Sequence, residues 1–152
     1  MSDCTIRLAT VDDLETLVEF TIAEAAEAEG RGLDRDLVRR AVVATFEEPF
    51  LARYWIAVDG QGRSVACISS GLEWSDFCAG WYWWVRSIFV DPALRGTGLA
   101  AELLDHLSAE AREAGAVDLR LYVHAGNVRA RRAYLNCGFA PAPYEIMTRQ
   151  LR

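Results

Sequence analysis

Two glycines and an arginine stand between a strand-like and a helix-like segment, a pattern typical of a phosphate-binding turn. The stretch reads Val90-Asp91-Pro92-Ala93-Leu94-Arg95-Gly96-Thr97-Gly98-Leu99-Ala100. Gly96 and Gly98 let the backbone approach a ligand without a Cβ in the way. The helix that follows directs its free N–H groups and the positive end of its dipole at the same point, and Arg95 adds a permanent positive charge. We therefore expect this turn to bind a phosphate group.

Two common phosphate-binding motifs do not fit this turn. A dinucleotide fold needs a tight turn, but residues 91–95 separate the strand from the glycines. The next strand ends in Val123-His124, without the acidic residue that binds a ribose. A P-loop needs Lys-Ser/Thr after its glycines, and none follows here.

The turn instead resembles the acetyl-CoA-binding motif, Arg/Gln-x-x-Gly-x-Gly/Ala, of the GCN5-related N-acetyltransferase (GNAT) superfamily. The matching residues are Arg95-x-x-Gly98-x-Ala100, preceded by Ile88-Phe89-Val90-x-Pro92. A second stretch, Asn127-x-x-Ala130-x-x-x-Tyr134-x-x-x-Gly138-Phe139, resembles the superfamily's later signature. The resemblance covers residues 5–149, the first half by element order alone. It implies a single domain over residues 1–152 with an α/β fold, whose mixed, mostly antiparallel sheet is splayed at its centre and has helices on both faces.

The resemblance also implies the activity. An acetyl group would pass from acetyl-CoA, the co-substrate, to a primary amine of a small molecule by direct attack in a ternary complex, without a metal and in a homodimer. Two alternatives stay open: an acyl-CoA-binding regulatory module, and a peptide or protein N-acetyltransferase. The residues that the resemblance assigns to acetyl-CoA binding are Ile88, Phe89, Val90, Arg95, Gly96, Thr97, Gly98, Leu99, Ala100, Asn127, Ala130, Arg131 and Arg132.

Tyr134 is the expected catalytic acid. Attack of an amine on a thioester expels a thiolate, which a nearby phenol can protonate. Periodicity alone favours a packed aromatic on an amphipathic helix, and the motif around Tyr134 reverses that preference.

The general base is harder to place. Many members of the superfamily carry a Glu or Asp on the strand that leads into the turn, but residues 81–90 contain no carboxylate. The candidates are Glu73 or Asp76 in the preceding loop, His124 after the next strand, and a chain of water molecules. The ordinary pKa of histidine suits His124 to the role, although a strand-end histidine and solvated loop acids are the plainer interpretations.

Arg86 lies on the same strand, where an arginine would repel a polycation or pair with the carboxylate of an amino-acid-like acceptor. A structural pairing with an acid of the sheet or a helix is the alternative. The surrounding aromatic residues would form a wall of the acceptor site or fill the core. Successive side chains of a strand point to opposite faces of the sheet, so only half of them can lie on each face. These residues are Trp74, Phe77, Trp81, Tyr82, Trp83 and Trp84.

Composition excludes several classes of protein. The chain has 152 residues, 52% hydrophobic and 25% charged, which favours one ordinary globular domain. A net charge of −6 disfavours nucleic acid as a general partner, and no apolar run is long enough for a membrane. The start of the chain lacks a secretion signal, so we expect a cytoplasmic protein. Four scattered cysteines and two histidines predict reduced thiols rather than a zinc site.

Periodicity predicts the order β-α-α-β-β-β-α-β-α-β. The strands are expected over residues 6–8, 54–58, 64–72, 81–90, 119–123 and 139–147. The helices are expected from about 14 to Gly30, from Asp34 to Pro49, from Leu99 to Gly115 and from Asn127 to Asn136. Residues 73–80 are expected to form a loop that, with the first two helices, surrounds the acceptor.

Overall fold

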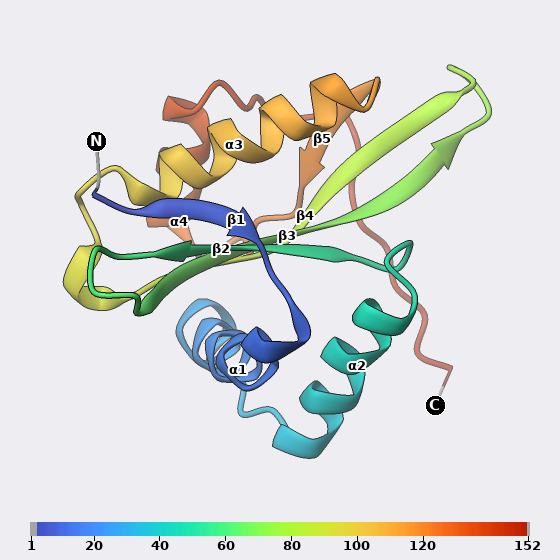
Figure 1. Cartoon of the computed structure of the whole chain (residues 1–152). Helices are drawn as coiled ribbons and strands as arrows, with labels where there is room; N and C mark the ends of the chain where they lie inside the picture. Colours follow the sequence, from blue (N-terminus) through green and yellow to red (C-terminus); the bar gives the residue numbers. More distant parts are fainter. Residues whose placement is uncertain (1–2, 152) are drawn as a thin grey trace.

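One five-stranded sheet organises the chain in the computed structural model, which describes residues 3–151 (Figure 1). Its strands are β1 (Thr5–Leu8), β2 (Arg53–Val58), β3 (Ser64–Ser75), β4 (Gly80–Val90) and β5 (Asp118–Leu121), in the spatial order β1-β2-β3-β4-β5. The first four strands are antiparallel to their neighbours, whereas β4 and β5 are parallel. The mixed, mostly antiparallel sheet predicted from the sequence is therefore confirmed.

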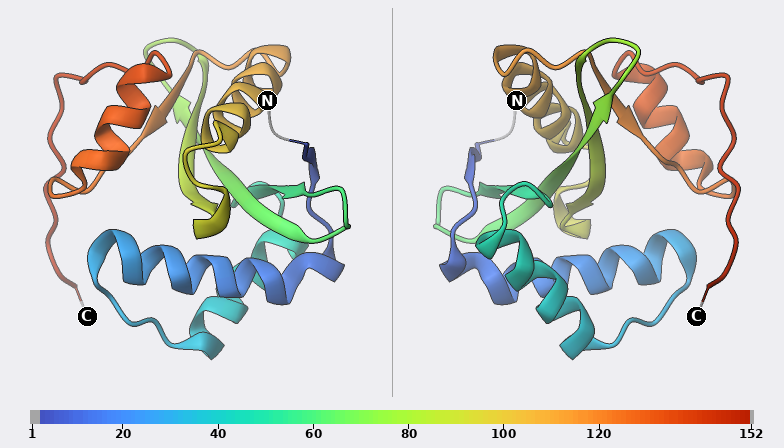
Figure 2. Two further views of the ribbon diagram at one scale, coloured as in Figure 1. Left: turned by 90° about the vertical axis from the view of Figure 1, so that its left-hand side faces the viewer. Right: turned by 90° about the vertical axis from the view of Figure 1, so that its right-hand side faces the viewer.

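Helices cover both faces of this sheet, as predicted (Figures 1 and 2). On one face lie α1 (Leu14–Glu29) and α2 (Arg35–Glu47), and on the other lies α3 (Leu99–Glu113). The short α4 (Val128–Asn136) places one side chain, that of Tyr134, against the core that α3 covers. The two faces have separate cores, and α3 contributes Leu99, Leu103, Leu104 and Leu107 to one of them. Burial of each of these leucines stabilises the fold by roughly 1.5–3 kcal/mol.

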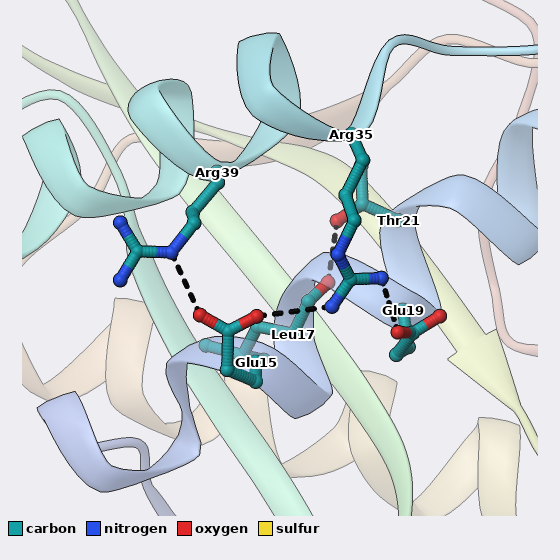
Figure 3. Close-up of polar contacts among 6 residues, drawn as sticks. All are labelled: Glu15, Leu17, Glu19, Thr21, Arg35 and Arg39. Atoms are coloured by element: carbon teal, nitrogen blue, oxygen red, sulfur yellow. Dashed lines mark hydrogen bonds and ion pairs between the residues drawn. The ribbon is translucent and has the colours of Figure 1, made fainter.

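An ion-pair network fixes α1 against α2 (Figure 3). The carboxylate of Glu15 accepts from Arg39 Nε at 2.7 Å and from the guanidinium of Arg35 at 3.0 Å, and Arg35 also pairs with Glu19. Each exposed pair contributes little alone, but together they link the two helices at four side chains. The remainder of α1 then lies at a fixed angle beneath the sheet.

The sheet opens between β4 and β5. The two strands pair only from Tyr82–Asp118 to Val85–Leu121, while β4 continues to Val90. The last five residues of β4 therefore have one edge without a partner strand. A β-bulge adds Arg86 to β4 opposite the junction of Ser69 and Ser70 and increases the local twist. This separation is the central splay that the sequence predicted.

Two sequence expectations are wrong in detail. The loop expected over residues 73–80 is reduced to a turn over residues 76–79, because β3 and β4 stay paired as far as Ser75 and Gly80. The final strand expected over residues 139–147 does not form: the described residues after α4 contain no further helix or strand. Pro141 and Pro143 explain the second error, since each lacks the N–H that a ladder needs.

Candidate functional site

The glycine turn leads directly into α3, as the sequence predicts. Gly96 and Gly98 have positive φ values of 81° and 92°, which side chains with a Cβ adopt only with strain. Gly98 is the N-cap of α3, and Glu102 N makes the first helical bond back to it at 3.0 Å. The N–H groups before Glu102 have no helical carbonyl to donate to, so they are available to an anion.

Arg95 lies beside this turn but faces an acid of α1. Its guanidinium pairs with Glu27 at 2.5 Å, and its Nε donates to the carbonyl of Val90 at 3.1 Å. The positive charge is therefore positioned by the end of β4 and balanced by a carboxylate that comes from 68 residues earlier in the chain. An anion bound at the turn would compete with Glu27 for Arg95.

A second carboxylate of α1 lies against the open edge of β4. Glu24 Oε1 accepts a hydrogen bond from the backbone N–H of Ile88 at 3.1 Å. Ile88 belongs to the part of β4 that has no β5 partner, so this N–H would otherwise lack a partner from the sheet. The neighbouring Phe89 is buried and stacks on Phe20 of α1, with ring centroids 4.6 Å apart. That stacking holds α1 close to β4.

Glu24 titrates far from the ordinary range of a glutamate. Burial is the main cause and raises its pKa from 4.5 to about 7, and the negative charges of Glu29 and Glu27 add to the rise. The hydrogen bond from Ile88 acts in the opposite direction. A carboxylate with this pKa can both accept and release a proton near neutral pH.

A row of hydroxyl groups crosses the same face of the sheet. Ser69 and Ser87 pair across β3 and β4, with their Oγ atoms 2.7 Å apart. Tyr54 of β2 pairs with Ser69 in the register, and burial raises the pKa of its phenol to about 12. The electrostatic influence of Glu24 reaches both Tyr54 and the buried thiol of Cys67. The core between α1 and the sheet is therefore polar at this place.

Arg86 extends over this face beside the bulge. Gly71 makes room for it, because a Cβ at Gly71 would lie 2.8 Å from Arg86 Nε and 3.2 Å from the carbonyl of Leu51. Within residues 3–151, Arg86 has no ion pair, which argues against the structural pairing considered above. By alternation along β3, Gly71 shares a face with Ser69 and Cys67, so the guanidinium is on the same side of the sheet as Glu24.

Tyr134 is on α4 and half-buried. Its ring packs edge-on against Phe139, with centroids 5.9 Å apart. Burial raises the pKa of its phenol to about 12, and the negative charge of Glu24 contributes to the rise. The charge of Glu24 therefore reaches Tyr134, which is 110 positions later in the chain. In the described part of the chain the Tyr134 hydroxyl has no protein hydrogen-bond partner, which leaves it free for a ligand.

The start of α4 carries the other residues expected to bind a ligand. Asn127 is the N-cap, and its Oδ1 accepts from Ala130 N at 3.1 Å. Arg131 and Arg132 are exposed on this helix. An open depression of about 470 Å³ follows the outer surface of α4, lined by Val128, Arg129, Arg132, Ala133 and Asn136. Two arginines in a mainly apolar lining suit a flat anionic group.

Two of the base candidates named from the sequence, Glu73 and His124, lie elsewhere. Glu73 is on β3, where its carboxylate accepts from Trp84 Nε1 at 2.5 Å. Its register partner is Tyr82, six residues or about 20 Å from Ile88 along β4. His124 is exposed in the loop before α4, and its Nδ1 accepts from Gly126 N at 3.1 Å. Neither residue lies at the opening between β4 and β5. The acid that does lie there is Glu24, which the sequence analysis did not identify.

Other potential sites are absent from the described residues. No three His, Cys, Asp or Glu side chains in residues 3–151 gather as a metal ion would require. The four cysteines are free thiols. None of the helices in this part of the chain has the length and apolar character needed to cross a membrane.

Comparison with known proteins identifies similar sequences and folds. Residues 14–139 match the sequence model of the acetyltransferase (GNAT) family. An aminoalkylphosphonate N-acetyltransferase of Salmonella typhimurium is 29% identical over 146 residues, which are 96% of this chain and 91% of that protein. An acetyltransferase of Agrobacterium fabrum is 30% identical over 122 residues, which are 80% and 84% of the two chains. The crystal structure of a possible acetyltransferase from Clostridium difficile has a TM-score of 0.91 at 28% identity, and 98% of each chain is covered.

Proposed function

The chain belongs to the acetyltransferase (GNAT) family of acetyl-CoA-dependent enzymes, and we propose that its acceptor is the primary amine of a small molecule that also carries an anionic group. The observation that carries this proposal is Arg86, whose guanidinium has no ion pair within residues 3–151 and lies on the same sheet face as the half-buried carboxylate of Glu24. Together they offer one group for an anion and one for an amine. The relative from Salmonella typhimurium is named for an acceptor of that class, an aminoalkylphosphonate.

The residues at the opening between β4 and β5 fit acetyl-CoA. The Ile88 N–H at the unpaired edge of β4 suits a carbonyl of the pantetheine arm. The turn at Gly96 and Gly98, with the first N–H groups of α3, suits the pyrophosphate. Arg131 and Arg132 at α4 suit the 3′-phosphate. Acetyl-CoA supplies an acetyl group activated as a thioester.

Side chains of the protein then have to accept and donate the protons that this reaction transfers. Transfer forms a C–N bond and breaks a C–S bond. The ammonium group of the acceptor loses two protons in all. The sulfur leaves with the electron pair of the C–S bond and gains one proton. The net product besides CoA and the amide is one proton released to solvent. We propose that Tyr134 donates to the departing sulfur, because its phenol stays protonated at neutral pH and its hydroxyl has no hydrogen-bond partner within residues 3–151. Solvent then returns a proton to the phenolate.

Removal of the Arg95 charge should weaken acetyl-CoA binding. We expect Arg95→Ala to raise the KM for acetyl-CoA about tenfold, the scale of one lost charge-assisted hydrogen bond. Glu27→Gln is the matched variant, because it removes the acid that pairs with Arg95 and should lower this KM. Steady-state kinetics at saturating acceptor measure both. An unchanged KM in both variants would contradict the placement of the pyrophosphate.

Acceptor preference tests the proposed substrate class. Free-thiol release from acetyl-CoA is measured with aminoalkylphosphonates, amino acids, polyamines, aminoglycosides and short peptides. We expect the acceptors that carry an anion to have the highest kcat/KM. Arg86→Gln should raise their KM about tenfold and leave the KM of a neutral amine of similar size within about twofold.

Three results would contradict the proposal. Preference for polyamines would contradict an anion-binding role of Arg86. Preference for peptides would point to a protein acceptor. Tight acetyl-CoA binding without thiol release for any amine would point to a regulatory binding module.

A further inference from the structure

Glu24 is a charged residue on the inward face of α1, and its place needs an explanation. Glu24 is seven positions after the fully buried Leu17, or about two helical turns, so the two side chains share one stripe of the helix. The other described acids of α1 lie at the surface: Glu15 and Glu19 pair with α2, Glu27 with Arg95 and Glu29 with Arg31. Packing alone would favour an apolar side chain at position 24.

We propose that Glu24 is the general base of the transferase, accepting a proton from the acceptor ammonium after a ligand carbonyl has taken over its hydrogen bond from Ile88. This inference rests on the proposed function. Glu24 is at the unpaired edge of β4, where the acetyl group has to lie if the pantetheine arm follows that edge. It lies within electrostatic reach of Tyr134, the proposed acid. The base and the acid therefore come from opposite sides of the same opening.

Ligand binding would strengthen this base. The bond from Ile88 stabilises the charged form of Glu24 and lowers its pKa. When the Ile88 N–H donates to a ligand instead, that stabilisation is lost and the carboxylate becomes a better proton acceptor. The free carboxylate would then face the acceptor amine. In the unliganded protein the same bond satisfies an N–H that the sheet leaves without a partner.

The groups that face Glu24 set the pH at which it works. Burial raises its pKa most, and the neighbouring acids add to the rise. The phenols and the thiol whose pKa values respond to Glu24 are neutral at pH 7. Neither of two arginines in this part of the fold pairs with Glu24: Arg95 pairs with Glu27, and Arg86 lies beside Gly71. The titratable or charged groups concerned are Glu27 and Glu29 of α1, Tyr54 of β2, Cys67 of β3, Arg86 of β4, Arg95 of the turn and Tyr134 of α4.

The test is the pH dependence of kcat/KM for the acceptor, at saturating acetyl-CoA, between pH 5.5 and 9. With acetyl-CoA bound, the Ile88 N–H no longer lowers the pKa of Glu24, so the wild type should lose activity about tenfold per pH unit on the acidic side of a midpoint above about 7; this is the acidic limb of the profile. Glu24→Gln should lower the rate at pH 8 about 100-fold and abolish this limb. The profile is measured with two acceptors whose ammonium pKa values differ. If the acidic limb reports a group of the enzyme and not the acceptor, its midpoint should be the same with both. Glu19→Gln is the control: this acid is on the same helix, is exposed and pairs with Arg35, and the limb should persist.

A second measurement tests the same assignment without an assay of activity. The amide resonance of Ile88 should shift with a midpoint near pH 7 as its acceptor gains a proton, and Glu24→Gln should remove the shift. An active Glu24→Gln enzyme with the wild-type pH profile would overturn the role of Glu24 and leave the proposed function intact. A wild type that acetylates no amine would overturn the proposed function itself.

Discussion

Tyr134→Phe is expected to lower kcat about 100-fold while the KM for acetyl-CoA stays within about twofold. The phenyl ring preserves the edge-on contact with Phe139, so only the hydroxyl is lost. Because burial holds the pKa of Tyr134 at about 12, the phenol is protonated at every pH used in an assay. Its loss should therefore reduce the rate by a similar factor at all pH values. Steady-state kinetics between pH 6 and 9 measure this pattern.

The control for this variant is Tyr122→Phe. Tyr122 stacks on Trp84 with centroids 4.4 Å apart and is exposed, and its hydroxyl has no assigned role. We expect kcat to be unchanged in that variant. A Tyr134→Phe enzyme with the wild-type kcat would assign Tyr134 to packing, and one with a raised acetyl-CoA KM and unchanged kcat would assign it to binding.

Local patterns in the sequence predict the parts of the site that come from one continuous segment. The strand, Gly96, Gly98 and the first turn of α3 occupy adjacent positions, and the positive φ values of both glycines agree with the role expected of them. Asn127 caps α4 as expected. In each case the residue type is required by the backbone at its own position, so the neighbouring sequence is sufficient.

Contacts between distant segments are what the sequence does not show. Nothing near Arg95 indicates that Glu27 is its partner, and the acids of α1 look alike as a solvated face. Glu24 had one available signal: it is seven residues after Leu17 and three after Thr21, which places it on the apolar stripe. An acid on that stripe is the exception that predicts a functional carboxylate. Glu73 lies away from the opening between β4 and β5 because the β3–β4 pairing continues to Ser75 and Gly80, which places residue 73 within the strand and not in a loop.

The half-buried carboxylate of Glu24 should also cost stability, and the cost should depend on pH. The pKa of Glu24 is about 7 in the folded protein and 4.5 without the fold. Below pH 4.5 the group is protonated in both states, so it has no effect. Between pH 4.5 and 7 the folded state holds the proton more tightly, so stability falls as the pH rises. Above pH 7 the full cost remains.

Glu24→Gln should therefore be more stable than the wild type at neutral pH, by about 3 kcal/mol, since each pKa unit corresponds to about 1.36 kcal/mol. For a domain of this size the midpoint of thermal unfolding should rise by roughly 6–12 °C at pH 7.5 and by much less at pH 4.5. Denaturation of both proteins across this range measures the difference, in which the other titrating groups cancel. Glu19→Gln should show no such pH-dependent gain, because Glu19 is exposed. A constant difference between Glu24→Gln and the wild type would mean that Glu24 is solvated. A difference that grows as the pH rises through 4.5–7 would mean that the fold keeps a costly acid at the place where the reaction needs a base.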